Sequence, residues 1–282
     1  MKPEFIDVLI CPTCHVQLAS TDAELHCGSC DKVYPIVRGV PRFVDNNEDY
    51  AENFGVQWQR FRTLQVDRLA GHKLSTTRFL ADTGWGGSLK GQLVLDAGCG
   101  AGRFSDVLAE FGANVVACDL SSAVDACRQN VDDRQKANLA RGDVLVMQAN
   151  LTELPLKPAV FDAVYCAGVI QHTHAPDQVM RALIKYVKPG GQLFFNFYEK
   201  STFSRLQLIK YTLRRWTPFW PINRLHRFCR ALCAIFFWPS LVLSRLPLLR
   251  QINRLLPICS VLPRDLSIEL QKQLTLLDTI DW

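Results

Sequence analysis

The sequence predicts an α/β protein built on a doubly wound, mostly parallel sheet. Between residues 91 and 200, apolar runs of strand length alternate with helical patterns. A glycine-rich turn separates the first of these runs from the first helical pattern. Strands that alternate with helices indicate a parallel sheet. A strand that feeds a glycine turn and then a helix is the layout of a nucleotide-binding crossover.

Five strands are predicted from short runs rich in apolar, β-branched and aromatic residues. They cover residues 93–95, 114–118, 144–148, 161–166 and 192–197, and the turn Pro189-Gly190-Gly191 precedes the last of them. Because ligands of such sheets bind outside the carboxyl ends of the strands, the polar residues at those ends are the candidates for function.

The turn after the first strand reads Asp96-Ala97-Gly98-Cys99-Gly100-Ala101-Gly102. A dinucleotide fingerprint would need its third glycine at position 103, which is Arg103. Gly98 and Gly100 let the backbone turn sharply and approach a ligand closely. This stretch resembles motif I of the class I S-adenosylmethionine-dependent methyltransferases. The resemblance implies a Rossmann-like methyltransferase core in which Asp96 holds the ammonium group of the donor; the alternative is a tight turn without a ligand.

The ends of the next two strands extend this resemblance. Asp119 comes 23 residues after Asp96, where an acid can accept hydrogen bonds from both ribose hydroxyls of an adenosyl group. The alternative there is a helix N-cap, which Ser121 or Ser122 would also suit. Asn150 stands where the family usually has Asp facing the adenine amine, and its side-chain carbonyl can accept the same bond. The predicted cofactor-binding residues are Asp96, Ala97, Gly98, Cys99, Gly100, Gly102, Asp119, Leu120, Asn150, Leu151, Cys166, Ala167 and Gly168, with Leu120 and Leu151 on either side of the adenine.

The stretch Ala167 to His174 follows the fourth strand and resembles the "Gly-Val-Leu-His-His" text of the same group. His172 matches the second histidine, and Gln171 replaces the first. A histidine here is a candidate general base toward a substrate hydroxyl or acidic carbon, with His174 as a second candidate. The competing view is that His172 only shapes the pocket, because alignment of the nucleophile alone can lower the barrier by about 7–11 kcal/mol. Tyr198 and Glu199 are further candidates past the fifth strand.

Two C-x2-C knuckles stand near the N-terminus, Cys11–Cys14 and Cys27–Cys30, with twelve residues between the inner cysteines. This spacing suits a tetrahedral four-cysteine site for structural Zn²⁺. Two disulfides or metal-free thiols are the alternatives, and the neighbouring His15 and His26 are interpreted as bystanders. Residues 1–45 resemble the small zinc-ribbon protein that activates several tRNA and protein methyltransferases, which implies a scaffold rather than a catalyst.

Composition places the protein in a reducing compartment. Eleven cysteines accompany an N-terminus that lacks the apolar region of a secretory signal, so a cytoplasmic protein is predicted. The net charge of +5 is unevenly distributed, because residues 200–264 contain twelve Lys or Arg and no Asp or Glu. We therefore expect this segment and the core to face different partners.

The basic segment 201–262 also carries aromatic and aliphatic runs. Three interpretations stay open: an interfacial helix pair on anionic lipid at the inner face of the membrane, a lid over an amphipathic or acidic substrate, and a plain helical subdomain with solvated arginines. Its longest apolar run, Ala231–Leu243, is about 13 residues and contains Pro239, which is too short to span a bilayer. No RNA-binding motif accompanies the segment, which disfavours nucleic acid.

The predicted organisation has five parts. They are a zinc ribbon (1–45), a linker and helical segment that helps cover the cofactor (46–90), the S-adenosylmethionine-binding core (91–200), a basic apolar helical insert (201–264) and the start of a truncated C-terminal part of the core (265–282). In the second part, Trp58 and Phe61 serve either as this cover or as ordinary helix packing. The resemblance to class I methyltransferases implies an antiparallel hairpin that completes a seven-stranded sheet, and no sequence remains for it. We therefore expect a truncated chain whose fifth strand forms an exposed edge.

The function predicted from these residues is methyl transfer from S-adenosylmethionine to an O, N or C nucleophile of a small or lipid-like acceptor. The alternatives are a tRNA or protein methyltransferase, which the ribbon suggests, and an interaction protein with a degenerate core. Oligomeric state is left open.

Overall fold

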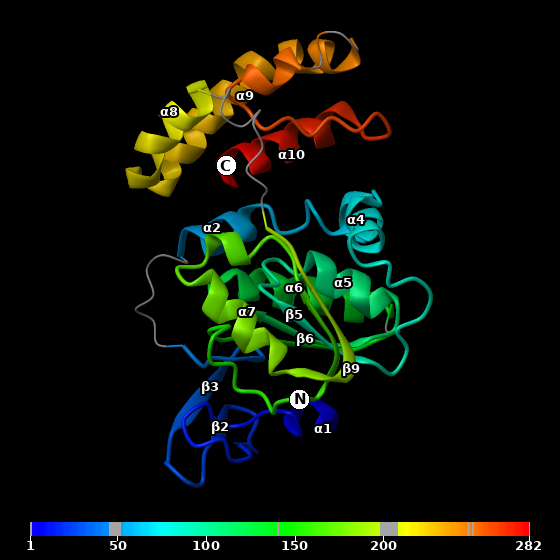
Figure 1. The fold of residues 1–282 in the computed structure, drawn as a ribbon, viewed down its shortest axis with the longest axis vertical. Coiled ribbons are helices and arrows are strands. Elements are labelled where there is room, and N and C mark those ends of the chain that lie inside the picture. Colours follow the sequence, from blue (N-terminus) through cyan, green and yellow to red (C-terminus); the bar gives the residue numbers. More distant parts are fainter. Residues whose placement is uncertain are drawn as a thin grey trace. The chain divides into compact units, whose positions relative to one another are not determined.

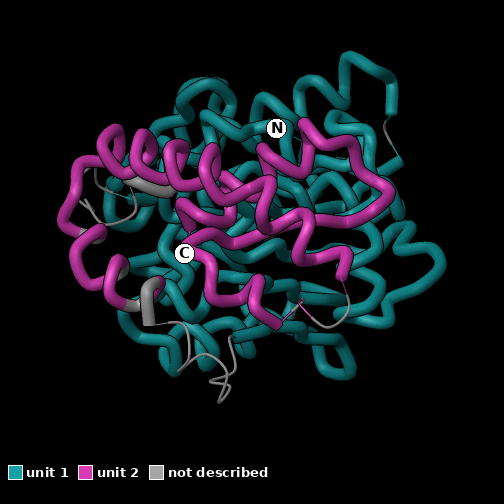
Figure 2. Tube along the Cα trace, turned by 90° about the horizontal axis from the view of Figure 1, so that it is seen from above, with its two compact units in different colours: residues 1–198 teal, residues 199–282 magenta. Residues whose placement is uncertain are grey.

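The computed structural model describes residues 2–44, 52–139, 141–197, 208–246, 249 and 251–281. The chain divides into two compact units, Met1–Tyr198 and Glu199–Trp282 (Figure 2). The first unit holds the sheet and the cysteine knuckles, and the second is helical.

The core of the first unit is a five-stranded parallel sheet (Figure 1). Its spatial order is β7-β6-β5-β8-β9, for β5 (Leu93–Ala97), β6 (Asn114–Asp119), β7 (Val144–Gln148), β8 (Phe161–Cys166) and β9 (Val187–Phe195). The prediction of a doubly wound parallel sheet is therefore confirmed. The strand order reverses direction at β5, so the crevice for a ligand is expected at the carboxyl end of this central strand.

Helices cover one face of this sheet, and a helix together with the ribbon covers the other. Alternate strand residues point to opposite faces, and the buried residues accordingly form two clusters. Val94, Val115 and Val146 pack with α4 (Leu74–Thr83), α5 (Arg103–Glu110) and α6 (Ala123–Lys136). Leu95, Val116 and Met147 pack with α7 (Pro176–Ile184) and with the N-terminal module. The remaining short elements of this unit are α2 (Glu52–Arg60), α3 (Asp67–Ala70) and η2 (Ile170–His172).

The N-terminal module is an antiparallel sheet that shares the core of the larger sheet. It consists of α1 (Pro3–Ile6), β1 (Ala19–Ser20), β2 (Glu24–His26), β3 (Val33–Val37) and β4 (Val40–Pro41). Two backbone bridges join it to the core, Leu9 with Leu156 and Arg42 with Gln148. Leu9 and Leu25 are fully buried in the same cluster as Leu95. Folding of the module is thus tied to folding of the sheet.

β9 differs in its bounds from the predicted fifth strand, 192–197. Val187 pairs with Phe161, and pairing resumes only between Gln192 and Ala163, so the turn at Pro189–Gly191 interrupts the ladder inside the strand. The sequence pattern showed the turn but not the pairing on its N-terminal side. Within the described residues β9 pairs with β8 alone and forms one edge of the sheet.

In the part of the second unit that the structure describes there are three helices, α8 (Leu208–Trp216), α9 (Ile222–Arg245) and α10 (Ile268–Asp281), and two short 3-10 turns, η4 (Thr217–Phe219) and η5 (Ile252–Leu255). Helix α9 packs on α10. By their contacts residues 265–281 belong to this unit. That residues 265–282 begin a C-terminal part of the core stays a prediction.

Helix α9 is longer than its unbroken apolar run. It continues through the exposed Pro239 for 24 residues, and an 18-residue window within it has a mean hydropathy of 1.3. By length and composition alone the helix could cross a membrane, which corrects the view that this stretch is too short; 28% of that window is buried inside the protein.

Candidate functional site

The glycine turn wraps around the carboxyl end of β6. Gly98, Gly100 and Gly102 all have left-handed backbones, with φ of 82°, 52° and 82°. The amides of Gly98 and Cys99 donate to the carbonyl of Cys118 at 2.7 and 2.9 Å. Such φ values strain any residue with a Cβ, so the glycines are required by the shape of the turn.

Two side chains lie directly over these glycines. A Cβ at Gly98 would be 2.2 Å from Val169, and one at Gly100 would be 3.2 Å from the ring of Trp58. Val169 belongs to the loop after β8, and Trp58 lies on α2. The glycines therefore let these two side chains pack directly against the turn.

Asp119 ends β6 and joins it to the glycine turn. Its Oδ2 accepts the Gly100 amide at 3.0 Å, and its Oδ1 accepts the amide and hydroxyl of Ser121 at 2.9 and 2.7 Å. The N-cap of α6 is Ser122, and the Ser121 hydroxyl accepts the amide of Ala123. Asp119 is thus not the N-cap of this helix. A carboxylate has about four acceptor positions, so one remains for a ligand hydroxyl.

Asp96 lies beneath the turn at the end of β5. It is 2% exposed, and its Oδ2 accepts the Ser105 hydroxyl at 2.5 Å. Burial raises the pKa of Asp96 to about 7, with a further rise from the charge of Asp119, while the bond from Ser105 lowers it. A cation beside this carboxyl would restore its ionised form.

Asn150 follows β7 and forms a turn with Thr152. Its Oδ1 accepts the amide and the hydroxyl of Thr152 at 3.0 and 2.9 Å. An amide donor identifies this atom as the oxygen, and both of its lone pairs are used. The predicted bond from an adenine amine to this oxygen therefore has no free acceptor in this arrangement. Of the flanking residues, Leu151 is buried and Leu120 is half-buried.

Helix α2 lies close to the turn because Gly55 permits it. A Cβ at Gly55 would be 2.0 Å from the hydroxyl oxygen of Ser122, so a larger residue would push α2 away from α6. The sequence left Trp58 between cofactor cover and core packing. Its contact with Gly100 places it at the site, but only the three-dimensional packing of α2 shows this.

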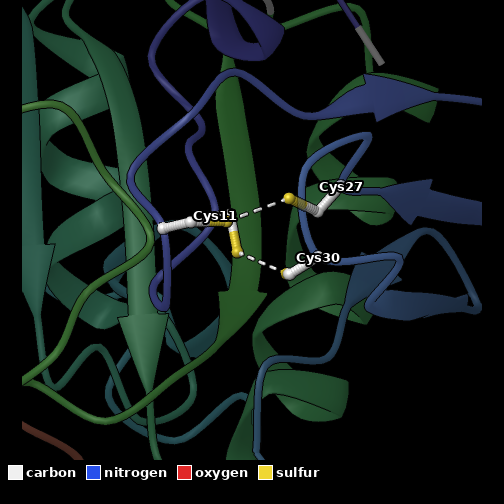
Figure 3. Close-up of side chains that lie close together, drawn as sticks. Cys11, Cys27 and Cys30 are labelled. Atoms are coloured by element: carbon white, nitrogen blue, oxygen red, sulfur yellow. Dashed lines mark hydrogen bonds between the residues drawn. The ribbon is translucent and has the colours of Figure 1, made fainter.

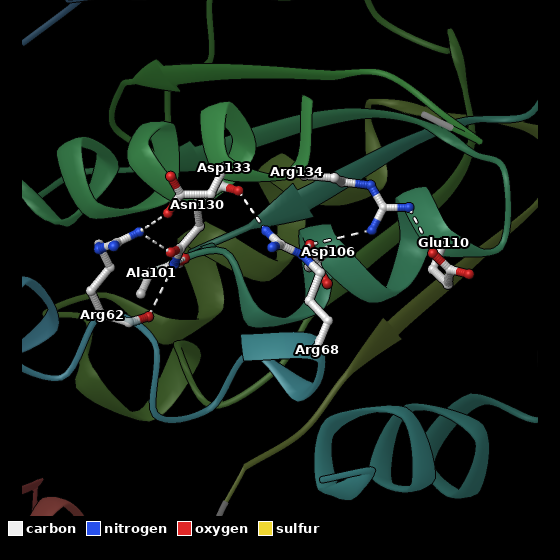
Figure 4. A network of polar contacts seen from close by, with 8 residues as sticks. All are labelled: Arg62, Arg68, Ala101, Asp106, Glu110, Asn130, Asp133 and Arg134. Carbon is white, nitrogen blue, oxygen red and sulfur yellow. Dashed lines mark hydrogen bonds and ion pairs between the residues drawn. The ribbon is translucent and has the colours of Figure 1, made fainter. Parts of the chain in front are cut away.

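A polar network ties the segment after α2 to the glycine turn (Figure 4). Asn130 of α6 donates to the carbonyls of Ala101 and Arg62 at 2.8 and 3.0 Å, and Arg62 in turn donates to Asn130 and Asp133. Arg68 reaches Asp106 at 2.8 Å. Sequence reasoning missed Asn130, because nothing near it in the chain marks a contact with residue 101.

The loop after β8 supplies the other wall. Cys166 is buried, and Ala167 and Gly168 are half-buried at the end of the strand. The Gly168 amide donates to Asn196 Oδ1 at 2.7 Å, which joins this loop to the end of β9. Tyr198 and Glu199 are outside the described residues.

The candidate bases differ in exposure. His172 ends η2 and is half-buried, whereas His174 is exposed. Beside them, both amide atoms of Gln171 are buried without a hydrogen-bond partner among the described residues. Buried polar groups are nearly always paired. Gln171 is therefore a candidate for ligand contact that its sequence position alone did not identify.

The four knuckle cysteines come together, and Figure 3 labels Cys11, Cys27 and Cys30 of this group. Their sulfur atoms all lie within 4.8 Å of one another, with Cys11 and Cys30 at 3.7 Å and Cys14 and Cys27 at 3.2 Å. Four sulfurs around a zinc ion at about 2.3 Å would be about 3.8 Å apart, so the donor set and spacing fit. Burial opposes ionisation of Cys11, but bonds from Tyr34 and from backbone amides lower the pKa of its thiol to about 5.

Comparisons with known proteins found relatives among curated sequences and solved structures. The ubiquinone biosynthesis O-methyltransferase of Pseudomonas fluorescens strain Pf0-1 is 36% identical over 117 residues, covering 39% of this chain and 45% of that protein. The ubiquinone biosynthesis O-methyltransferase of Albidiferax ferrireducens is 36% identical over 112 residues, covering 39% of this chain and 43% of that protein. The chain spans less than half the length of these curated relatives.

Among solved structures, the magnesium protoporphyrin IX methyltransferase of Synechocystis PCC 6803 is similar with a TM-score of 0.44 at 25% identity, over 58% of this chain and 76% of that chain. Residues 95–195, which hold the glycine turn, Asp119, Asn150 and the loop after β8, match the family described as "Methyltransferase domain".

Proposed function

We propose that this protein is an S-adenosylmethionine-dependent methyltransferase. The observation that carries the proposal is the bond between Gly100 and Asp119, which joins the glycine turn to the next strand end inside the segment that matches a methyltransferase domain. The junction brings the glycine turn, the buried Asp96 and the half-buried Asp119 together at the carboxyl ends of the strands. An adenosyl donor that carries an ammonium group would need a backbone it can approach and acids of this kind.

Each contact with the methyl donor is assigned to a side-chain group whose charge or free hydrogen-bonding position suits it. Asp96 would face the ammonium group, and the remaining acceptor position of Asp119 would take a ribose hydroxyl. For Asn150 the amide nitrogen is the group available, so we assign it to a ring nitrogen of adenine rather than to the amine. Trp58, which packs against Gly100, would border the donor. The bound donor would supply an electrophilic methyl group on sulfur.

For the acceptor we propose an oxygen nucleophile on a small or lipid-like molecule. The relatives' names support an O-methyl transfer. His172, half-buried after β8, would take the proton of the hydroxyl. The unpaired amide of Gln171 would orient the acceptor through one donated and one accepted hydrogen bond. Exposed His174 is assigned no contact with the reacting atoms.

We propose that the cysteine cluster holds structural Zn²⁺ and that the ribbon is a scaffold fused to the domain it supports. Four thiolates complete a tetrahedral site and leave no open position for catalysis. Support for the scaffold role comes from its shared core and from the bridge between Arg42 and Gln148, at the outer strand β7.

We propose that the protein is cytoplasmic, because cysteines stay reduced in reducing compartments and none of the eleven cysteines forms a disulfide in the structure. We further propose that part of 201–262 touches the inner face of the membrane, where a lipid-like acceptor would be found.

Titration calorimetry of the full, zinc-loaded chain with S-adenosylmethionine and its demethylated product tests the proposal. We expect saturable binding of one molecule of either per chain. Absence of heat with both compounds at concentrations up to about 1 mM, a weak limit for a cofactor site, would overturn the enzyme assignment. Transfer of isotope-labelled methyl to small phenols then separates an enzyme from a protein that only binds the donor.

The raised pKa of Asp96 predicts pH-dependent binding. The ammonium group of the donor attracts the ionised carboxylate, and a pKa of about 7 leaves this form scarce at pH 6. The association constant should therefore rise roughly six- to eightfold between pH 6 and 7.5. In the absence of donor, stability from the protonated Asp96 is lost as pH rises from its ordinary pKa of about 4 to about 7, and little changes above that. Calorimetry at both values checks this, and Asp96→Asn should bind weakly with little pH dependence. If the association constant of that variant changed with pH as much as that of the wild type, the assignment of Asp96 to the ammonium group would be wrong.

A further inference from the structure

We propose that the exposed face of α9 docks the protein on an anionic lipid bilayer, with its first half at the level of the phosphates and its second half among the acyl chains. The inference is independent of methyl transfer. It rests on how the helix distributes charged and apolar side chains over its two faces.

Contacts within the second unit determine which face of α9 is buried. His226, Cys229, Cys233, Phe237 and Leu241 are between 2% and 9% exposed. These residues recur every three or four positions and so share one side of the helix. The sulfurs of Cys229 and Cys233 both lie 3.8 Å from oxygens of Thr279 on α10. Because this side is held against α10, the opposite side faces outward.

The outward face is basic in its first half. Arg224, Arg227 and Arg230 are exposed, and their three-residue steps carry the row from the outward side at Arg224 to the margin of the buried side at Arg230. Arg224 also stacks on Trp220, with 4.4 Å between its guanidinium carbon and the ring centre. Guanidinium groups pair with phosphate oxygens and lie favourably against aromatic rings at a membrane interface.

The second half of the same face is mostly apolar, and the exposed Arg245 stands at its end. Ile235, Trp238 and Val242 are 64%, 54% and 57% exposed, and Leu246 continues the row just past the helix end. Trp216 and Phe219, from the short segment before α9, are 66% and 85% exposed. Large apolar side chains this exposed, in a continuous row, mark a surface that another phase or molecule covers.

Charge identifies the partner as anionic lipid. Residues 200–264 contain twelve basic and no acidic residues, so this surface is unsuited to a basic partner. Lys272 of α10 adds a further cation 5.1 Å from the ring of Trp238. An apolar row that continues an arginine row along one helix face matches the two layers of an anionic bilayer surface, phosphates above acyl chains.

A peripheral position is proposed rather than a membrane-spanning one. Although α9 has the length to cross a bilayer, its buried side is bonded to the rest of the unit, for example Ser240 to Asn253 at 2.6 Å. Crossing would separate α9 from α10 and expose the buried His226 and Ser240 to lipid. Lying in the interface keeps these contacts.

Co-sedimentation of the full chain with vesicles tests the proposal. Vesicles of phosphatidylcholine with about one-third phosphatidylglycerol should bind the protein, and pure phosphatidylcholine should bind it at least tenfold more weakly, since each interfacial basic residue is worth about fivefold. Binding should fall steeply at 0.5 M salt, where charges are screened beyond about 4 Å. Equal binding to both vesicle types would overturn the proposal.

Two variants locate the surface. Arg224→Glu, Arg227→Glu and Arg230→Glu together should lower the partition into anionic vesicles by at least fiftyfold. Ile235→Ser with Val242→Ser should lower it by about tenfold or more. Matched controls change residues of the first unit that are also exposed, namely Lys90, Arg181 and Lys185 to Glu, and Leu139 with Ile184 to Ser. Circular dichroism confirms that each variant keeps its helices.

Three outcomes would contradict the surface assignment. The control variants could lose as much binding as the α9 variants, which would indicate a general effect of charge. The bound protein could resist both salt and alkaline carbonate extraction, which would indicate a spanning helix. Without vesicles, sedimentation velocity could show a dimer that only the Ile235 and Val242 changes dissociate, which would assign the face to a second copy of the chain.

Discussion

Replacing Asp119 with alanine is expected to weaken binding of S-adenosylmethionine by roughly 30- to 200-fold. Two effects combine in this variant. It removes a charged acceptor for the ribose, and it removes the acceptor of the Gly100 amide, which holds the glycine turn in place. A hydrogen bond to a charged group is worth about 1.5–3 kcal/mol. Loss of the ribose bond together with a less rigid glycine turn should therefore cost about 2–3 kcal/mol of binding free energy. Titration calorimetry measures the loss directly.

The matched control for this variant is Asp162→Ala. Asp162 stands near the start of β8, at the opposite edge of the sheet, where it accepts the Leu93 amide at 2.8 Å and Lys188 at 2.7 Å. Its loss should lower the thermal midpoint and leave donor affinity unchanged. Asp119→Asn keeps one acceptor for Gly100 and should fall between wild type and alanine. If Asp119→Ala bound the donor as tightly as wild type, the assignment of the ribose contact would be wrong.

The sequence predicted the sheet well because its strands are buried on both faces. Such strands appear as continuous apolar runs, and Asn114–Asp119 and Phe161–Cys166 were recognised on that basis. The start of β9 was missed because Val187 pairs before a turn, and a turn usually marks a strand end. Pairing across an interruption depends on the partner strand, which the local pattern does not contain.

The site could be predicted only as far as the strand ends define it. Carboxyl ends of parallel strands meet at one edge, so Asp96, Asp119 and Asn150 were expected near each other from order along the chain. Which atom of Asn150 is occupied depends on Thr152 and on the turn between them. The contact of Trp58 with Gly100 and the unpaired amide of Gln171 arise from packing between segments far apart in sequence.

For the N-terminal ribbon and the helical second unit, too, the sequence did not predict contacts between segments that are far apart in the chain. Spacing predicted the four thiolates, but not that Leu9 and Leu25 of the ribbon would be buried in one cluster with the sheet. Composition predicted a basic, apolar, helical segment, but the division of α9 into a buried face and an outward face required the position of α10. Periodicity in the sequence shows that a helix is amphipathic. Only the position of the neighbouring helix shows which face of it is buried.

Removal of zinc is expected to lower the thermal midpoint of the first unit as a whole. Cys27→Ser takes away one thiolate of the cluster, and structural zinc contributes about 10–16 kcal/mol in isolated fingers. A loss of even a third of this free energy would be about 4 kcal/mol, which lowers the thermal midpoint by roughly 8–16 °C for a unit of this size. Because the ribbon and the sheet share one apolar cluster, both should unfold together. Scanning calorimetry with and without a chelator measures the shift, and metal analysis should find one zinc per wild-type chain.

Cys259→Ser supplies the control, because Cys259 is a half-buried thiol of the second unit, far in sequence from the cluster. It should keep its zinc and its midpoint. A separate low-temperature transition in Cys27→Ser, with donor affinity unchanged, would show that the ribbon unfolds alone and that the shared cluster contributes little. A variant that lost zinc without any change in the midpoint would argue against a structural metal. Joint unfolding with weaker donor binding would instead mean that the ribbon maintains the sheet edge on which Asp119 lies, since β4 contacts β7 and β7 pairs with β6 along Asp119.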